Sequence, residues 1–196
     1  MLFRSTSGLL VENQGGPSVK PYQPPGLWKE LTGDADYVPD HGENLYRRSL
    51  YTYWKRTVPP PGLSAFDASA REACWVRESR TNTPLQALTL LNETTFVEAA
   101  RNLAARTMQE MRTPEERISR AFQRVLSRSP TEAEMKVLRG HYDTRLTEYR
   151  RDAKAAEALL QTGESKFDAK LDRIELATLS SVCRLIFNLD EAVTKE

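Results

Sequence analysis

The sequence predicts an all-α protein: an irregular helical domain of five or six helices, preceded by an extended arm rich in proline and glycine. Eight of the eleven prolines and seven of the nine glycines lie before Leu63, so the first part of the chain favours turns and loops. After about residue 43, helix-start signals alternate with apolar side chains at helical spacing. We therefore assign residues 1–62 to the arm and residues 63–196 to a helical body within the same domain.

The arm is predicted to be an ordered, extended segment that lies over the helical body. Disordered linkers are poor in aromatic residues, whereas the arm contains four: Tyr22, Trp28, Tyr37 and Tyr46. A short helical turn is predicted at residues 27–31. Residues 1–16 read like the end of a helix that stops at a glycine pair. We therefore expect the chain to be the C-terminal fragment of a longer protein.

The helices expected before Thr113 are predicted from their caps. Asn44 is a plausible N-cap for a helix to about Arg56, although the aromatic residues there also permit a strand. Thr83 followed by Pro84 is a strong helix start, because proline lacks the N–H that would be unpaired at that position. Asn92 is expected to cap the helix after it.

Three capping pairs predict the remaining helices: Thr113 with Glu116, Thr131 with Glu134, and Asp172 with Glu175. Each pair precedes a stripe of apolar side chains spaced by three or four residues. The stripe after Thr131 continues without a break, so one long helix is predicted from Glu132 to Gln161.

Bulk composition excludes some functional classes. The 196 residues include 28 Lys+Arg and 27 Asp+Glu, which gives no reason to expect nucleic acid as a partner. No run approaches the roughly 18 apolar residues that a membrane span needs. The first residues lack the pattern of a signal peptide, because Arg4, Ser5 and Ser7 interrupt the apolar stretch.

Charge is unevenly distributed along the chain. Residues 12–46 carry six acidic side chains against two lysines, and residues 47–80 carry seven basic against three acidic side chains. The simplest interpretation is that these two segments pack on each other. The alternative is an anion-binding site, because arginine forks suit carboxylates, phosphates and sulfates. The candidate anion or substrate contacts are Arg71, Arg77, Arg80, Asn82, Gln86 and His41.

Other reactive residue types receive structural interpretations. His141 is predicted to be a solvated residue of the long helix, and Cys183 a buried core cysteine. A disulfide between Cys74 and Cys183 stays open, because sequence cannot show that they are close. The acids of residues 33–40 fail the EF-hand pattern and suggest a surface loop. No metal site is predicted, and no CxxCH haem-attachment motif is present.

Several long motifs resemble one family. They are GGPSVKPYQPPGLW (15–28), YRRSLYTYWKRTVPPP (46–61), FDASAREAC (66–74), RTNTPLQALTLLN (80–92) and the tail from Cys183 through Glu191. The chain resembles the C-terminal part of the planctomycete cytochrome-associated surface domain, domain of unknown function 1553. The resemblance implies a secreted or cell-surface bacterial protein in which this domain often follows a c-type cytochrome domain, where haem c would be held. It supplies no catalytic residues.

Two functions follow as hypotheses. The first is an accessory or interaction module of an extracytoplasmic protein, in the periplasm or at the cell surface, associated with cytochrome c and linked to polysaccharide use. Its partners would be the upstream domains of the same protein. The second is part of an enzyme site for an anionic or glycan substrate, completed by upstream domains and using Arg77, Arg80, Asn82 and His41. No signal peptide is present in this chain to fix the compartment.

Overall fold

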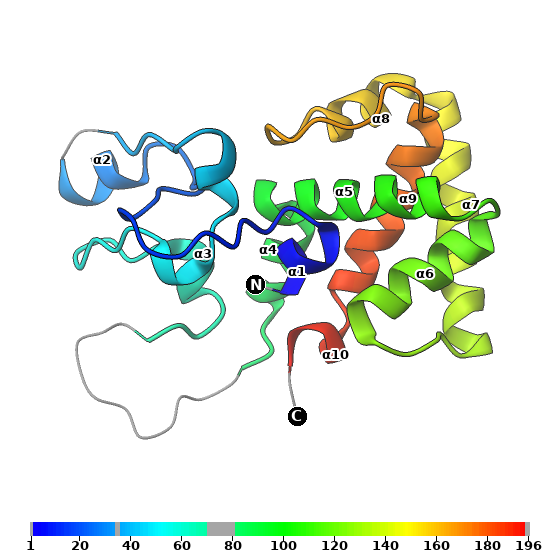
Figure 1. Cartoon of the computed structure of the whole chain (residues 1–196), viewed down its shortest axis with the longest axis horizontal. Coiled ribbons are helices and arrows are strands. Elements are labelled where there is room, and N and C mark those ends of the chain that lie inside the picture. The colour runs from blue at the N-terminus through cyan, green and yellow to red at the C-terminus, as the bar shows by residue number, and fades with distance from the viewer. Residues whose placement is uncertain (1, 34–35, 70–80, 195–196) are drawn as a thin grey trace. The chain divides into compact units, whose positions relative to one another are not determined.

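The computed structural model describes residues 2–33, 36–69 and 81–194 (Figure 1). Within these residues there are ten α-helices, two short 3₁₀ helices and only isolated β-bridges, so the predicted all-α class is confirmed. The six helices of eight residues or more are α4 (Pro84–Asn92), α5 (Thr94–Glu110), α6 (Pro114–Leu126), α7 (Glu132–Arg151), α8 (Ala153–Leu160) and α9 (Arg173–Phe187). The chain divides into two compact units. Unit 1 contains Met1–Leu9 and Leu90–Glu196, and unit 2 contains Leu10–Thr89.

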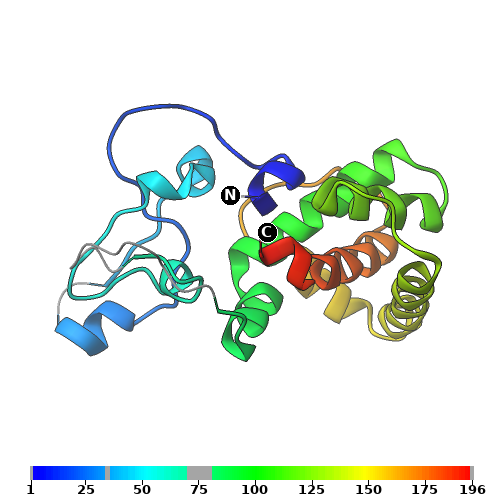
Figure 2. The ribbon, with the colours of Figure 1, turned by 90° about the horizontal axis from the view of Figure 1, so that it is seen from below.

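Unit 1 is a helical bundle built around α9. This helix contacts α5, α6, α7 and α8, and also the short α10 (Asp190–Val193). Figures 1 and 2 show α9, in orange to red, packed among the green and yellow helices of the unit. The core is almost completely inaccessible to solvent and includes Leu103, Phe122, Tyr142, Leu160, Leu176, Val182 and Phe187. The apolar stripes predicted on these helices therefore face one shared core.

The three predicted capping pairs are confirmed. The Thr113 side chain accepts from the Glu116 amide, and the Thr131 side chain accepts from the Glu134 amide. In both cases the glutamate carboxylate accepts in return from the threonine amide, which completes a capping box. Asp172 accepts from the amide of Glu175 at 2.8 Å and opens α9. These local bonds satisfy amides that a helix start otherwise leaves unpaired.

The prediction of one long helix from Glu132 to Gln161 is wrong. The helix ends at Arg151, and α8 starts at Ala153. Asp152 between them has φ −126° and ψ 80°, which is not helical, and its carboxylate accepts from the Ala155 amide at 3.1 Å. Aspartate favours this capping geometry because its short side chain reaches the backbone two to three residues on. The apolar stripe continues across the break, so the spacing of apolar residues gave no sign that the helix ends there.

Two other predicted boundaries move. Asn92 does not cap α5; it is the last residue of α4, and Glu93 occupies the N-cap position of α5 without a side-chain cap bond. The predicted helix end at a glycine pair is also displaced. The helix α1 (Leu2–Ser7) stops at Gly8, which has φ +80°. Glycine adopts this left-handed conformation without the steric cost that a β-carbon brings.

Unit 2 is mostly irregular backbone with short helices. They are α2 (Leu27–Thr32), the 3₁₀ helices η1 (Gly42–Tyr46) and η2 (Ser49–Tyr51), and α3 (Pro61–Ser64). The predicted turn at residues 27–31 is confirmed by α2. The predicted helix from Asn44 to Arg56 is wrong. In its place the Val19 amide donates to Tyr51 at 2.8 Å and the Tyr53 amide donates to Val19 at 2.8 Å. Pairing with a distant segment thus satisfies this aromatic-rich backbone, for which a strand-like conformation is favourable.

The described part of unit 2 buries few apolar side chains. Among its described residues, the buried hydrophobic ones are Val19, Leu45 and Val58. Its segments are held instead by polar contacts. The Arg47 guanidinium donates to the carbonyls of Asn13 (3.2 Å) and Pro17 (3.1 Å), and also to that of Gly15. An arginine of the basic segment therefore joins the acidic arm through backbone carbonyls.

Candidate functional site

The start of α4 uses one of the predicted contact residues for a structural purpose. Gln86 is buried, and its side-chain oxygen accepts from the Thr83 amide at 2.9 Å. The Gln86 amide donates in return to Thr83 Oγ1 at 3.3 Å. This reciprocal pair is a capping box with glutamine, and it confirms Thr83 as the cap of this helix. Gln86 is thereby committed to the helix start.

A carboxylate extends this network. Asp67 accepts from the Thr81 amide at 2.8 Å and from the Thr81 hydroxyl at 2.8 Å and 3.0 Å. The Gln86 side-chain amide also donates to Asp67, at 3.5 Å. The hydrogen bonds from Thr81 hold the pKa of Asp67 below its usual value. These hydrogen bonds connect Asp67 to the start of α4 through Thr81, Thr83 and Gln86.

The other predicted contacts are not assembled into a described site. Arg71, Arg77 and Arg80 lie outside the described residues, as does Cys74. Asn82 is exposed just before α4, and His41 is exposed at the N-cap of η1. Asn82 and His41 therefore lie in separate stretches of unit 2.

An aromatic–lysine cluster, formed by Lys20, Trp28, Tyr37, Tyr53 and Lys55, holds the arm together. The Trp28 ring lies 5.1 Å from Tyr37 and 5.9 Å from Tyr53 between centroids. The Lys55 ammonium lies 4.5 Å from the Trp28 centroid, and that of Lys20 lies 5.7 Å from the Tyr53 centroid. Cation–π contacts of this kind stabilise exposed sites by about 0.5–1 kcal/mol. The rings pack on one another, so these aromatic side chains help to hold the arm segments together.

The Tyr37 hydroxyl anchors this cluster to the backbone. It donates to the Pro21 carbonyl at 2.6 Å. Burial, with a smaller contribution from Asp40, raises the pKa of Tyr37 above its usual value, so the phenol stays protonated. Asp40 itself accepts from the Lys20 amide at 2.9 Å. This member of the predicted acidic surface loop thus ties two parts of the arm together.

Unit 2 also has large apolar side chains that are exposed to solvent. The helix α4 has no charged residue, yet Leu85 and Leu88 are 62% and 57% exposed. Leu50 of η2 is 75% exposed. Large apolar side chains gathered at a surface are typical of interaction sites, whereas single ones are ordinary. Leu85 and Leu88 lie three residues apart on one short helix, so they share a face.

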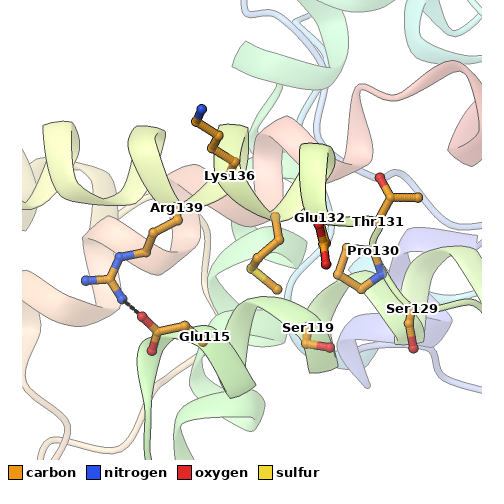
Figure 3. A pocket seen from close by; sticks show the side chains of 9 residues that line it. Glu115, Ser119, Ser129, Pro130, Thr131, Glu132, Lys136 and Arg139 are labelled. Carbon is orange, nitrogen blue, oxygen red and sulfur yellow. Dashed lines mark hydrogen bonds and ion pairs between the residues drawn. The ribbon is translucent and has the colours of Figure 1, made fainter.

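A groove lies between α6 and α7 in unit 1. It is widely open to solvent, has a volume of about 490 Å³ and is lined by Glu115, Ser119, Ser129, Pro130, Thr131, Glu132, Met135, Lys136 and Arg139. Figure 3 shows Arg139 reaching across one end of the groove to Glu115. Its volume falls within the range of small-ligand sites. Sequence reasoning missed it, because it arises only when two helix faces meet.

The most completely buried charges were also missed. Arg101 and Glu98 of α5 are each 1% exposed and lie 3.7 Å apart. Arg101 donates to the carbonyls of Leu160, Thr162 (2.7 Å) and Ser165 (2.5 Å), while Glu98 accepts from the Ser165 amide at 2.5 Å. This Glu98–Arg101 lock binds the loop between α8 and α9. The i, i+3 spacing in the sequence was its only signal, and that spacing is common on exposed helices.

The interpretation of His141 as a solvated residue is wrong. Its side chain is half-buried, and Nε2 lies 2.9 Å from the Ser181 hydroxyl of α9. Burial is the main cause that lowers the pKa of His141 below its usual value. Cys183 is a free, fully buried cysteine, as predicted for the core, and burial raises the pKa of its thiol.

Within residues 2–33, 36–69 and 81–194, no helix is both long enough and apolar enough to cross a membrane. The same part of the chain contains no group of three His, Cys, Asp or Glu side chains arranged to hold a metal ion.

These features define an all-α protein with an exposed leucine surface on a core-poor unit and a mixed apolar and charged groove on a well-packed one. Its family follows from the sequence: residues 3–142 match the model of PSD1, described as protein of unknown function (DUF1553), and the chain belongs to this family. Four of the five motifs named above lie within the matched range, and the tail from Cys183 lies beyond it. No curated protein and no solved structure matches the chain.

Proposed function

We propose that this chain is a non-catalytic helical module that binds a partner protein through unit 2. The observation that supports this function is the imbalance in that unit. It buries Val19, Leu45 and Val58 among its described residues, yet it leaves three leucines more than half exposed: Leu50, Leu85 and Leu88. Covering one such side chain contributes about 1.5–3 kcal/mol. A partner that covered these side chains would therefore supply apolar burial that the described part of unit 2 lacks.

The partner proposed is the set of upstream domains that the family resemblance implies. In this proposal the chain is the C-terminal part of a planctomycete protein, works outside the cytoplasm in the periplasm or at the cell surface, and serves polysaccharide use. Haem c is assigned to an upstream cytochrome domain, because this sequence contains no CxxCH. Membership of the DUF1553 family supports the family part of this proposal. The long motifs that led to the resemblance support the rest.

A pair of substitutions tests the interaction. In a longer family member that carries the upstream domains, Leu85→Gln with Leu88→Gln is expected to weaken the hold of this module on those domains at least tenfold. Polar side chains cannot repay the burial that two leucines provide. The measurement is the affinity between the separately purified upstream half and this chain, by calorimetry. Val137→Gln is the matched control, because Val137 is equally exposed at 65% but lies on α7 of unit 1.

Two results would count against the proposal. The first is equal affinity of the leucine variant and the control. The second is turnover of a glycan or sulfated glycan by the longer protein that is lost in Arg80→Ala without unfolding. The second result would favour the enzyme hypothesis in its place.

A further inference from the structure

A group of polar and basic side chains lies where α7 and α9 meet in unit 1, and we call it the α7–α9 cluster. On α7, His141, Arg145 and Tyr149 follow one another at intervals of four residues, so they share a face of the helix. On α9, Ser181 and Arg184 lie three residues apart and also share a face. The contact of 2.9 Å between His141 Nε2 and the Ser181 hydroxyl joins the two faces.

The side chains of this cluster lie close enough for their charges to act on one another. Burial lowers the pKa of His141, and Arg145 and Arg184 lower it further. Burial raises the pKa of Tyr149, an effect that the same two arginines oppose. Burial is also the main cause that lowers the pKa of Arg184; Tyr149 opposes this effect and Arg145 adds to it. Two guanidinium groups therefore repel each other beside a half-buried imidazole and a half-buried phenol.

Arg184 is the least compensated charge of the cluster. Its side chain is half-buried, and Nη2 donates to the Leu91 carbonyl in the last turn of α4. The negative end of a helix dipole offsets at most about half of a unit charge. Among the described residues, no carboxylate pairs with Arg184, and its buried Nε has no hydrogen-bond partner. Positive charge is therefore left over at this point of unit 1.

The other members of the cluster add donors to this charge. Glu148 is the acid that acts on His141 and Tyr149, but it is already paired with Arg145 at 2.7 Å. That pair is 43% and 52% exposed, so water screens it. The Tyr149 hydroxyl stays protonated and has no hydrogen-bond partner in the described part of the chain, so it is available as a donor.

We propose that the α7–α9 cluster binds a doubly charged oxyanion, phosphate or sulfate, either as the free ion or as a group on a larger molecule. Guanidinium groups match such oxyanions in charge and in the spacing of their donors. The anion would accept hydrogen bonds from Arg184 and from the Tyr149 hydroxyl, and it would relieve the repulsion between Arg184 and Arg145. This site lies within unit 1 and is independent of the partner surface proposed for unit 2.

His141 provides the readout. The chain contains two histidines, His41 and His141, so their C2 proton signals can be followed separately by NMR over a pH titration. Sodium sulfate in place of sodium chloride, at equal ionic strength, should raise the midpoint of His141 by about 0.3–0.5 pH units, because a nearby anion favours the imidazolium about two- to threefold. The midpoint of His41, an exposed residue of unit 2, should stay unchanged.

Three substitutions separate this site from general attraction of anions. Sulfate affinity, measured from amide shifts at pH 7, should weaken about tenfold in Arg184→Gln and about threefold in Tyr149→Phe. Tyr149→Phe removes only the hydroxyl, so it tests the site even where loss of the Arg184 contact to Leu91 destabilises the fold. Arg150→Gln is the matched control: it removes the same charge from an exposed position of α7 and should change affinity less than about twofold.

A comparison of inorganic phosphate with methyl phosphate distinguishes the two sources of the anion. Equal affinity would indicate a group on a larger molecule, and a preference for inorganic phosphate would indicate the free ion; either result agrees with the proposal.

Three outcomes would overturn the inference. They are an unchanged His141 midpoint in sulfate, equal changes at both histidines, and unchanged sulfate affinity in both Arg184→Gln and Tyr149→Phe. None of these measurements involves Leu85 or Leu88, so failure of the partner surface in unit 2 would leave them unaffected.

Discussion

Gly163 lies against the Glu98–Arg101 lock at a point where no side chain fits. Its φ is +82°, and a β-carbon placed on it would overlap the Glu98 carboxylate. A left-handed conformation already costs a non-glycine residue about 1–2 kcal/mol. The carboxylate has little freedom to move, since it accepts from Ser165 and pairs with Arg101 in a solvent-free site. Backbone shape and buried charge therefore depend on each other at this residue.

Gly163→Ala is expected to destabilise the protein by about 2 kcal/mol or more, because strain and displacement of a buried charge add together. Urea unfolding followed by circular dichroism measures the change in free energy. A loss below about 0.5 kcal/mol would contradict the close packing against Glu98.

Gly140→Ala is the matched control. Gly140 lies inside α7 with no positive φ, and a β-carbon there would meet nothing within 4 Å. Alanine is a better helix former than glycine, so this variant should be stabilised by about 0.5–1 kcal/mol. Opposite signs for two glycine-to-alanine changes would show that local context, not residue type, decides the effect.

At the scale of elements, α7 and α9 are joined by a titratable contact. Nε2 of His141 on α7 lies 2.9 Å from the Ser181 hydroxyl on α9. Burial, and then the neighbouring charge of Arg145, lowers the pKa of His141 below its ordinary value of 6.5, with a further contribution from Arg184. Glu148 opposes these effects. The neutral imidazole is therefore the form that the helix pair favours.

This contact predicts a loss of stability in acid. The unfolded chain takes up the proton first, so the contribution of His141 is fully present above its ordinary pKa of 6.5 and is lost as pH falls through the lower folded value. His141→Gln keeps a hydrogen-bonding group but does not titrate. Its free energy of unfolding should change less than that of the wild type between about pH 7.5 and about pH 5.

Urea unfolding at both pH values measures this difference. His41→Gln is the control, because His41 is an exposed residue of unit 2. An unchanged pH dependence in His141→Gln would show that the imidazole does not contribute to the joint between these helices.

For the whole molecule, the two units differ in what holds them. Unit 1 gathers apolar side chains from five long helices into one core. Unit 2 relies on carbonyl contacts to Arg47, cation–π pairs around Trp28 and the Asp67 network. Breaking a polar contact costs little net free energy, because water replaces the lost hydrogen bonds. Exposing buried apolar area to water costs more, because nothing replaces the burial. The two units should therefore differ in local stability.

Amide hydrogen exchange tests this difference. Amides of α5 and α9 should exchange slowest, through global opening, and those of η1, η2 and α2 should exchange orders of magnitude faster, through local opening. Equal protection in both units would contradict the view that the described part of unit 2 is held mainly by polar contacts. Slower exchange of unit 2 within the longer protein would agree with the proposed partner surface.

Much of the fold was predictable because helix starts are local. Thr83, Thr113, Thr131 and Asp172 cap their helices through bonds that span three residues, so their identity alone suffices. The helix break at Asp152 was missed because its apolar stripe runs on. The segment after Asn44 was misassigned because its backbone partners are Val11 and Val19, far earlier in the chain.

The candidate site was less predictable than the fold. The candidate polar residues near Gln86 were grouped because they are of similar type and close together along the chain. Residue type does not reveal which group a side chain will bind in the folded protein. Gln86 serves a helix cap, and the arginines before it lie outside the described residues. The α6–α7 groove and the Glu98–Arg101 lock combine residues whose individual sequence signals are unremarkable.

The sequence by itself determined the all-α class, the helix starts with their caps, and membership of the DUF1553 family, because these depend on residues close together or in fixed order. Only the tertiary structure decided which charged side chains are buried and which apolar side chains are exposed. It buried Arg101 and half-buried His141, which look like surface residues in a helix, and it exposed Leu85 and Leu88, which look like core. Burial is a property of neighbours brought from elsewhere in the chain, and helical periodicity gives a face without saying what covers it.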